Sequence, residues 1–139
     1  MSDPLSIASA IVGILAAAGK IIEVLGPYVS AAKDVPEIAT MVHSEVVNSR
    51  IMLSALKSLL SNLSSASITR KLLISIDDLI AVVTNGVLLF SALEGTVASN
   101  DDWKSRLHWA RKEGHFSAIL AKLQAFKSTT VLLLNILQW

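Results

Sequence analysis

The run from Pro4 to Gly19, close behind the initiator methionine, carries no charged side chain and is apolar on every face of a helix. One stripe at helical spacing consists of Leu5, Ala8, Val12 and Leu15. A second stripe, on the other side, consists of Ile7, Ile11, Ile14, Ala18, Ile21 and Leu25. A helix that is apolar all round is not stable on a water-facing surface, so we expect it either at the centre of the protein or in lipid.

The composition favours helices packed on helices in one domain. The chain has 139 residues, of which 53% are hydrophobic and 17% charged, and its mean hydropathy is +0.59. No uncharged run reaches the roughly 20 residues of an ordinary membrane span. Leu, Ile, Ala and Ser are abundant while Gly and Pro are few, which is typical of helical domains.

Charge and cysteine content exclude several classes of partner and chemistry. The net charge of +1 gives no general attraction to nucleic acid or to anionic lipid. The absence of cysteine excludes disulfides, thiol nucleophiles and thiolate metal sites, and fits an intracellular protein. Asp3 places a negative charge where a secretory signal needs a positive one, so Asp3-Pro4 is interpreted as a helix start.

Stop and start signals divide the chain into helices. The first is expected from Pro4 to about Leu25, with Gly26-Pro27 ending or kinking it and a short continuation over 28–33. Asp34 and Glu37 predict the start of a second helix, which the serine-rich stretch 61–67 ends. Its buried stripe is predicted to be Ile38, Val42, Val46, Ser49, Leu53, Leu56, Leu60 and Leu63.

The second half of the chain predicts further helices. One starts near Ser67 with its apolar stripe at Leu72, Ile76, Leu79, Val83, Gly86, Phe90 and Leu93, and a loop follows over 95–100. A shorter helix over 101–115 has a stripe of Trp103, Leu107, Ala110 and Gly114. A last helix from about Phe116 buries Ile119, Leu123, Phe126, Leu133 and Leu137. With no alternating strand pattern, we predict an all-α fold, an up-and-down bundle of four to five helices with a hydrophobic N-terminal helix, as one domain over residues 1–139.

No residue pattern indicates catalysis, and we expect no enzyme, cofactor, metal or small-molecule substrate. The three histidines lack carboxylates at ligand spacing, and Asp77-Asp78 point about 100° apart on a helix. No serine lies in a nucleophile elbow and no glycine loop could hold a phosphate. Nucleic acid is likewise not an expected partner.

A basic segment near the C-terminal helix is weighed as a contact for lipid headgroups or a partner. Its cations are Lys104, Arg106, Arg111 and Lys112, and three neighbouring acids leave a net charge of only +1. At about 1 kcal/mol per basic residue near an anionic surface, the attraction is weak, and a solvated face is favoured.

Membrane insertion of the first helix is marginal for one copy. Its six strong apolar residues contribute about −2 to −4 kcal/mol, whereas Lys20 and Glu23 would each cost about 2.5–3.5 kcal/mol near the bilayer centre. Insertion is therefore expected to depend on oligomerisation. The nine residues expected to enter the bilayer are Leu5, Ile7, Ile11, Val12, Ile14, Leu15, Ile21, Ile22 and Leu25.

Three segments carry a family resemblance: residues 3–13 (DPLSIASAIVG), residues 106–113 (RLHWARKE) and the Leu-x-x-x-Lys-Ser stretch of 123–128. Together they resemble the N-terminal domain of fungal STAND and NLR-like proteins and ankyrin-repeat proteins, of the HeLo or HeLo-like type. The resemblance implies a helical bundle N-terminal to a NACHT, NB-ARC or ankyrin region. It also implies that receptor oligomerisation releases the first helix, which permeabilises a membrane and causes regulated cell death.

Two functions stay open at this point. In the first, the domain is a membrane-active effector, cytoplasmic at rest and at the plasma membrane on activation, with membrane lipids and other copies of itself as partners. In the second, it is a non-lytic interaction or oligomerisation module with the first helix as permanent core. The apolar end 131–139 also predicts self-association or contact with a following domain.

Overall fold

The computed structural model describes residues 4–31, 35–62, 76–98 and 106–138. They form α1 (Pro4–Ala31), α2 (Glu37–Asn62), α4 (Ile76–Ala98), α5 (Arg106–Arg111) and α6 (Glu113–Gln138). Within these ranges there is no β-strand, which confirms the predicted all-α helical bundle. The predicted caps and stripe residues at positions 3, 34, 63, 67, 72 and 103 lie outside the described residues.

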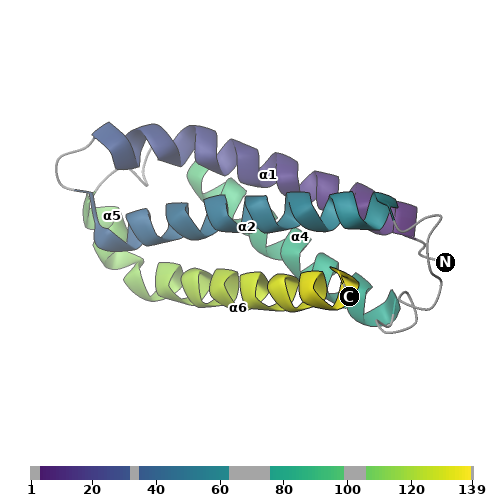
Figure 1. The fold of residues 1–139 in the computed structure, drawn as a ribbon. Coiled ribbons are helices and arrows are strands. Elements are labelled where there is room, and N and C mark those ends of the chain that lie inside the picture. Colours follow the sequence, from purple (N-terminus) through teal and green to yellow (C-terminus); the bar gives the residue numbers. More distant parts are fainter. Residues whose placement is uncertain (1–3, 32–34, 63–75, 99–105, 139) are drawn as a thin grey trace.

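The four long helices alternate in direction, with α1 and α4 running one way and α2 and α6 the other (Figure 1). α1 packs against both α2 and α4, and α6 packs against α2 and, over a smaller area, against α4. The order around the bundle is therefore α1, α2, α6, α4. Because α2 and α4 occupy diagonal corners, the chain does not pass from each helix to an adjacent one, as it does in the simplest up-and-down bundle.

Every long helix contributes apolar side chains to one core, as the stripes predicted. The largest side chains in it with almost no exposure are Trp109, Phe90, Phe116, Ile11, Ile14, Ile21, Leu25, Leu53, Leu56, Leu93 and Leu123. α2 begins at Glu37, later than a cap at Asp34 predicts, and the carbonyl of Pro36 accepts a hydrogen bond from the amide of Ala39 at 3.0 Å. The negative charge of Glu37, in the first turn, interacts favourably with the positive end of the helix dipole.

The predicted stop at Gly26-Pro27 is wrong, because α1 runs through Pro27 to Ala31. Proline removes one helical hydrogen bond and crowds the preceding turn, a cost of about 3 kcal/mol. Burial on both sides of it offsets that cost: Leu25 is fully buried, and Tyr28 and Val29 are packed against the core. Tertiary packing therefore overrides the local signal, and the expected continuation is part of the same helix.

The predicted loop over 95–100 is also wrong over residues 95–98, because α4 continues to Ala98. Val97 is buried and holds the last turn against the core. The hydroxyl of Thr96 donates a hydrogen bond to the carbonyl of Ala92 at 3.0 Å. Gly95 is exposed and does not interrupt the helix.

The expected stripe of the 101–115 segment is wrong in register. Ala110 and Gly114 are exposed, whereas Trp109 is buried and stacks on Phe116 with ring centroids 4.0 Å apart. The error lies within α5 itself, because its buried face passes through Trp109 rather than the adjacent Ala110. Seven residues on, Phe116 continues that face, and the last helix starts at Glu113 rather than at the expected Phe116.

Of the two places expected for the first helix, the centre of the protein is contradicted, whereas lipid stays a prediction. α1 occupies a corner of the bundle, and its outward face includes Val12, which is 47% exposed, together with the exposed Gly13 and Ala16. These outward positions are apolar by residue type, but alanine and glycine present little side-chain area to water. A helix rich in small residues can therefore face solvent on one side despite its high hydropathy.

Candidate membrane-insertion helix

The bundle hides most of the residues predicted to enter a bilayer. Ile7, Ile11, Ile14, Ile21 and Leu25 are buried against α2 and α4, and they form the second of the two predicted stripes. The remaining described members are less covered: Leu15 and Ile22 are half-buried, and Val12 is exposed. The side chain of Leu5 lies outside the described residues. The apolar surface of α1 is therefore directed into the bundle.

α1 has the dimensions of a membrane span. The segment Ser9–Ser30 has 22 residues and a mean hydropathy of 1.8. At about 1.5 Å per residue it is roughly 33 Å long, close to the ~30 Å thickness of the hydrocarbon core of a bilayer. Because the helix passes through Pro27, this length is available without a break.

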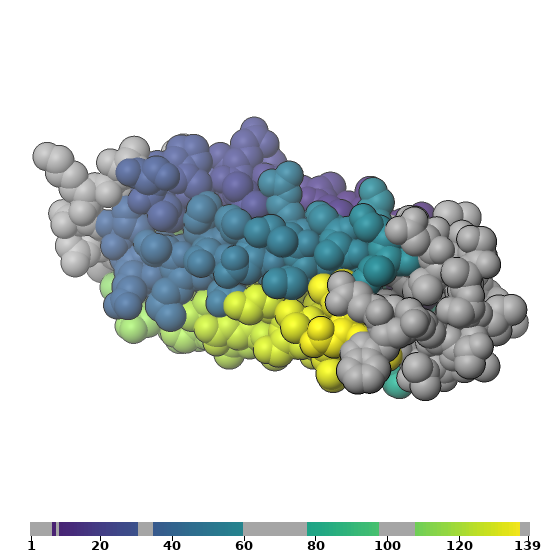
Figure 2. All heavy atoms as spheres, viewed as in Figure 1, coloured from purple at the N-terminus to yellow at the C-terminus, as the bar shows by residue number. Residues whose placement is uncertain are grey.

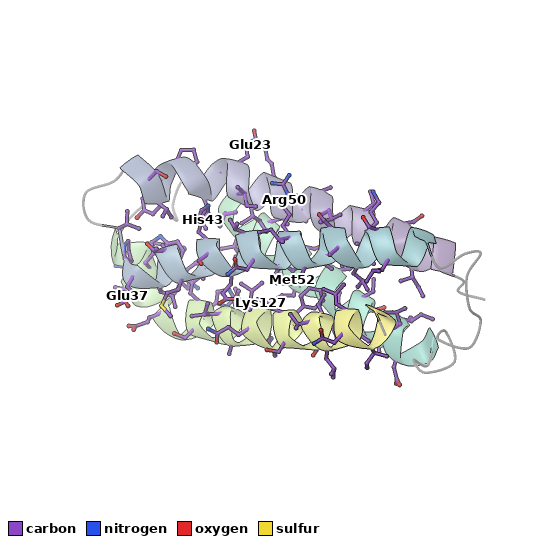
Figure 3. All side chains as sticks on the ribbon, in the orientation of Figure 1. Glu23, Glu37, His43, Arg50, Met52 and Lys127 are labelled. Atoms are coloured by element: carbon purple, nitrogen blue, oxygen red, sulfur yellow. The ribbon has the colours of Figure 1, made fainter. Side chains whose placement is uncertain are left out.

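Two charges lie inside that segment and pair with each other. Lys20 Nζ lies 4.0 Å from Glu23 Oε1, one turn away, and both side chains are exposed. Glu23 projects away from the bundle in Figure 3. In water such an exposed pair stabilises the helix very little, but a paired lysine and glutamate would cost less to move into lipid than two separate charges.

Two further helices meet the same criteria of length and composition. They are Asp78–Val97 in α4, with a mean hydropathy of 1.6, and Glu113–Ile136 in α6, with 1.2. α1 differs from them in its higher hydropathy and in its place near the N-terminus.

The predicted basic contact is described in part. Arg111 and Lys112 are exposed where α5 meets α6, whereas Lys104 and the side chain of Arg106 lie outside the described residues. The exposed Glu113 follows directly. The described part of this segment therefore presents two cations beside one acid, which agrees with a solvated face.

The α2–α6 interface contains a polar layer that the sequence did not reveal. Lys127 Nζ lies 2.8 Å from Glu45 Oε2, and the two side chains are only 27% and 14% exposed. Lys127 lies between the two helices in Figure 3, and Figure 2 shows the face on which they meet. The hydroxyl of the buried Thr130 donates to the carbonyl of Phe126 at 2.8 Å, so this hydroxyl is satisfied within its own helix.

His43 is placed where α2 meets α1. A Cβ atom added at Gly26 would lie 3.4 Å from its Nε2, so the ring lies against the α1 backbone close to Pro27. Burial lowers the pKa of His43, because the charged imidazolium loses solvation there. Among the described residues no three His, Cys, Asp or Glu side chains are grouped so that they could hold a metal ion.

A groove of about 550 Å³ opens between α4 and α6. Its apolar lining includes Val82 and Leu89 from α4 and Ile119 and Phe126 from α6. It exists because α6 packs extensively on α2 and only lightly on α4. No sequence pattern could have located it, since it depends on the spacing of two helices rather than on either helix alone.

Comparison of the chain with protein-family models, with curated proteins and with solved structures gives no match. The HeLo-like resemblance therefore stays a prediction.

Proposed function

We propose that this domain permeabilises membranes by releasing α1 from the bundle into a lipid bilayer. The observation that carries the proposal is the combination of a 22-residue apolar segment near the N-terminus with a corner position in the fold. A corner helix can leave while α2 and α6 keep their mutual contacts. The resemblance would place this step in fungal regulated cell death, with the domain cytoplasmic at rest and at the plasma membrane on activation.

Release must be coupled to another favourable process, because it exposes the buried isoleucine stripe. Burial of one such side chain is worth about 1.5–3 kcal/mol, and lipid can replace the protein as the apolar environment. For a single copy, replacing protein by lipid yields little net free energy, because Lys20 and Glu23 enter the bilayer together with the helix. Several copies that share those charges in an assembly would gain more, so permeabilisation should rise steeply with protein concentration.

The test measures leakage of a dye from anionic vesicles. It compares the same substitution, alanine to aspartate, at one position on α1 and one on α2. Ala16 is exposed on α1, so Ala16→Asp leaves the core intact but charges the interior of the span. An aspartate at the bilayer centre costs about 2.5–3.5 kcal/mol, so leakage should fall by about a hundredfold. Ala55→Asp, on an exposed position of α2, is the matched control and should leak like the parent.

Equal leakage from the two variants would reject insertion of α1. Circular dichroism and thermal unfolding of each variant establish that the bundle has kept its helices. Both variants lose the same alanine helix propensity, so a difference between them reports the location of the charge.

The second candidate is a non-lytic interaction module, in which α1 stays packed. Exposed leucines away from α1 favour it: Leu88 on α4 is 65% exposed and Leu132 on α6 is 58% exposed. This candidate requires the amides of the buried α1 stripe to keep their protection from hydrogen exchange when anionic vesicles are added. Loss of that protection on vesicle binding would exclude it in favour of insertion.

A further inference from the structure

The groove between α4 and α6 combines an apolar floor with a cationic rim. Ile119 and Phe126 lie at its α6 side, and the exposed Lys122 lies between them in sequence. His115 adds a ring nitrogen at the start of α6, and Asn85 adds an amide from α4. No acidic side chain lines the groove in the described part of the chain, so its only formal charge is that of Lys122.

Lys122 is available to a ligand. It makes no ion pair with another described residue, unlike Lys127 in the same helix, which is held by Glu45. Helical side chains lean toward the helix N-terminus, which favours a position of the Lys122 ammonium group on the His115 side of the groove. The groove therefore has a polar end near the start of α6 and an apolar remainder.

We propose that this groove binds one long-chain fatty acid, with the carboxylate at Lys122 and the tail along the apolar floor. The lining on α6 extends from His115 to Thr129, about 21 Å of helix. One lipid tail spans half of a bilayer core, about 15 Å, and so fits within that length. The positive rim matches a head group with a net negative charge, which a neutral alcohol or a zwitterionic lipid lacks.

The volume favours a small molecule over a helical peptide as occupant. A helix about 10 Å wide and 21 Å long takes up roughly 1,600 Å³, about three times the groove. The groove volume of about 550 Å³ instead lies within the ordinary range of sites for small molecules.

The experiment measures displacement of a fluorescent 18-carbon fatty acid by palmitate, without vesicles and below the critical micelle concentration. Palmitate should bind saturably at one per chain and more tightly than hexadecanol, which has the same tail but no charge. Lys122→Met keeps the length of the side chain and removes its charge, and it should weaken palmitate binding at least tenfold. Lys57→Met, at an exposed lysine on α2 outside the groove, is the matched control and should bind like the parent.

A variant that fills the groove tests whether palmitate binds in the groove or elsewhere on the protein. Ala125 lines the groove and is exposed, so Ala125→Trp fills it without entering the core and should abolish binding. Absence of saturable binding, or equal binding by Ala125→Trp and the parent, overturns the proposal. So does binding to anionic vesicles without binding to free palmitate, which would assign the rim to a membrane surface.

This site is independent of the proposed insertion of α1. Ala16→Asp, which should stop vesicle leakage, should bind palmitate like the parent protein. Failure of either proposal is therefore visible without failure of the other.

Discussion

At the scale of single residues, Gly86 on α4 lies against side chains from two other helices. A Cβ atom added there would lie 2.7 Å from Cε1 of Phe126 on α6 and 3.0 Å from Cδ1 of Ile14 on α1. The ring of Phe126 is in turn held in an edge-to-face contact with Phe90, with centroids 5.8 Å apart. Gly86 is thus a packing requirement of the bundle, and any side chain there must displace part of the core.

Gly86→Ala should therefore destabilise the protein although alanine favours helix. Overpacking a core costs about 1–3 kcal/mol, whereas the gain in helix propensity is about 1 kcal/mol. Gly95→Ala in the same helix is the matched control, since its Cβ would meet nothing within 4 Å, and it should stabilise by up to ~1 kcal/mol. Urea unfolding followed by circular dichroism measures both. Stabilisation of similar size in the two variants would contradict the close packing at Gly86.

His43 makes stability depend on pH. Because its pKa is lowered in the folded state, the unfolded chain binds a proton more readily as the pH falls. The free energy of unfolding is therefore highest above the ordinary histidine pKa of about 6.5 and falls as the solution is acidified through and below it. His43→Gln should flatten that slope.

The measurement is urea unfolding at several pH values between about 5 and 8. His115→Gln removes an exposed histidine and leaves the contribution of His43 in place, so its slope should stay close to that of the parent. If the parent and His43→Gln lose stability equally on acidification, the contact between His43 and α1 does not govern the effect.

At the scale of helices, the pair of Glu45 and Lys127 joins α2 to α6. Lys127→Met leaves the carboxylate of Glu45 largely buried without its partner, which should cost about 1–3 kcal/mol. Combining it with Glu45→Met removes the unpaired charge and should recover much of that loss. Lys122→Met, at an exposed lysine in the same helix, should change stability by less than about 0.5 kcal/mol. A double-mutant cycle by thermal unfolding gives the coupling, and a value near zero would show that the two side chains do not interact in solution.

The existence of the long helices follows from sequence periodicity, but their ends do not. The core stripes through Ile11, Val46 and Phe90 are at the positions that the spacing predicts. The observed helix ends differ from the predicted ones where burial outweighs a local stop signal. Burial of Leu25 outweighs Pro27 in α1, and burial of Val97 outweighs Gly95 in α4. Local rules describe the chain in water, and these termini are stabilised by contacts that form only in the folded bundle.

The candidate sites also differ in whether the sequence alone could locate them. The membrane-length segment of α1 could be found from the sequence, because hydropathy and length are properties of one segment. The stacking of Trp109 on Phe116 was not predicted, although residues seven apart can share one face of a helix. The α4–α6 groove could not be found from the sequence, because it depends on the relative placement of two helices.

At the scale of the whole molecule, the bundle stores an apolar helix with its isoleucine face inward and its small residues outward. α1 contacts α2 and α4, while the α2–α6 contact is maintained on the other side of the molecule (Figure 1). This arrangement keeps the apolar stripe away from water in the resting state. In the proposed function, the same stripe would exchange protein for lipid while the α2–α6 contact is kept.

The most direct test follows α1 itself. The chain has no cysteine, so Val12→Cys gives one labelling site at an exposed position of α1 for a polarity-sensitive fluorophore. On anionic vesicles, the emission should shift to the blue and the fluorophore should become protected from iodide quenching. Ser58→Cys, exposed on α2, is the control and should stay quenchable. A fluorophore at residue 12 that iodide still quenches on vesicles the protein has permeabilised would contradict insertion of α1.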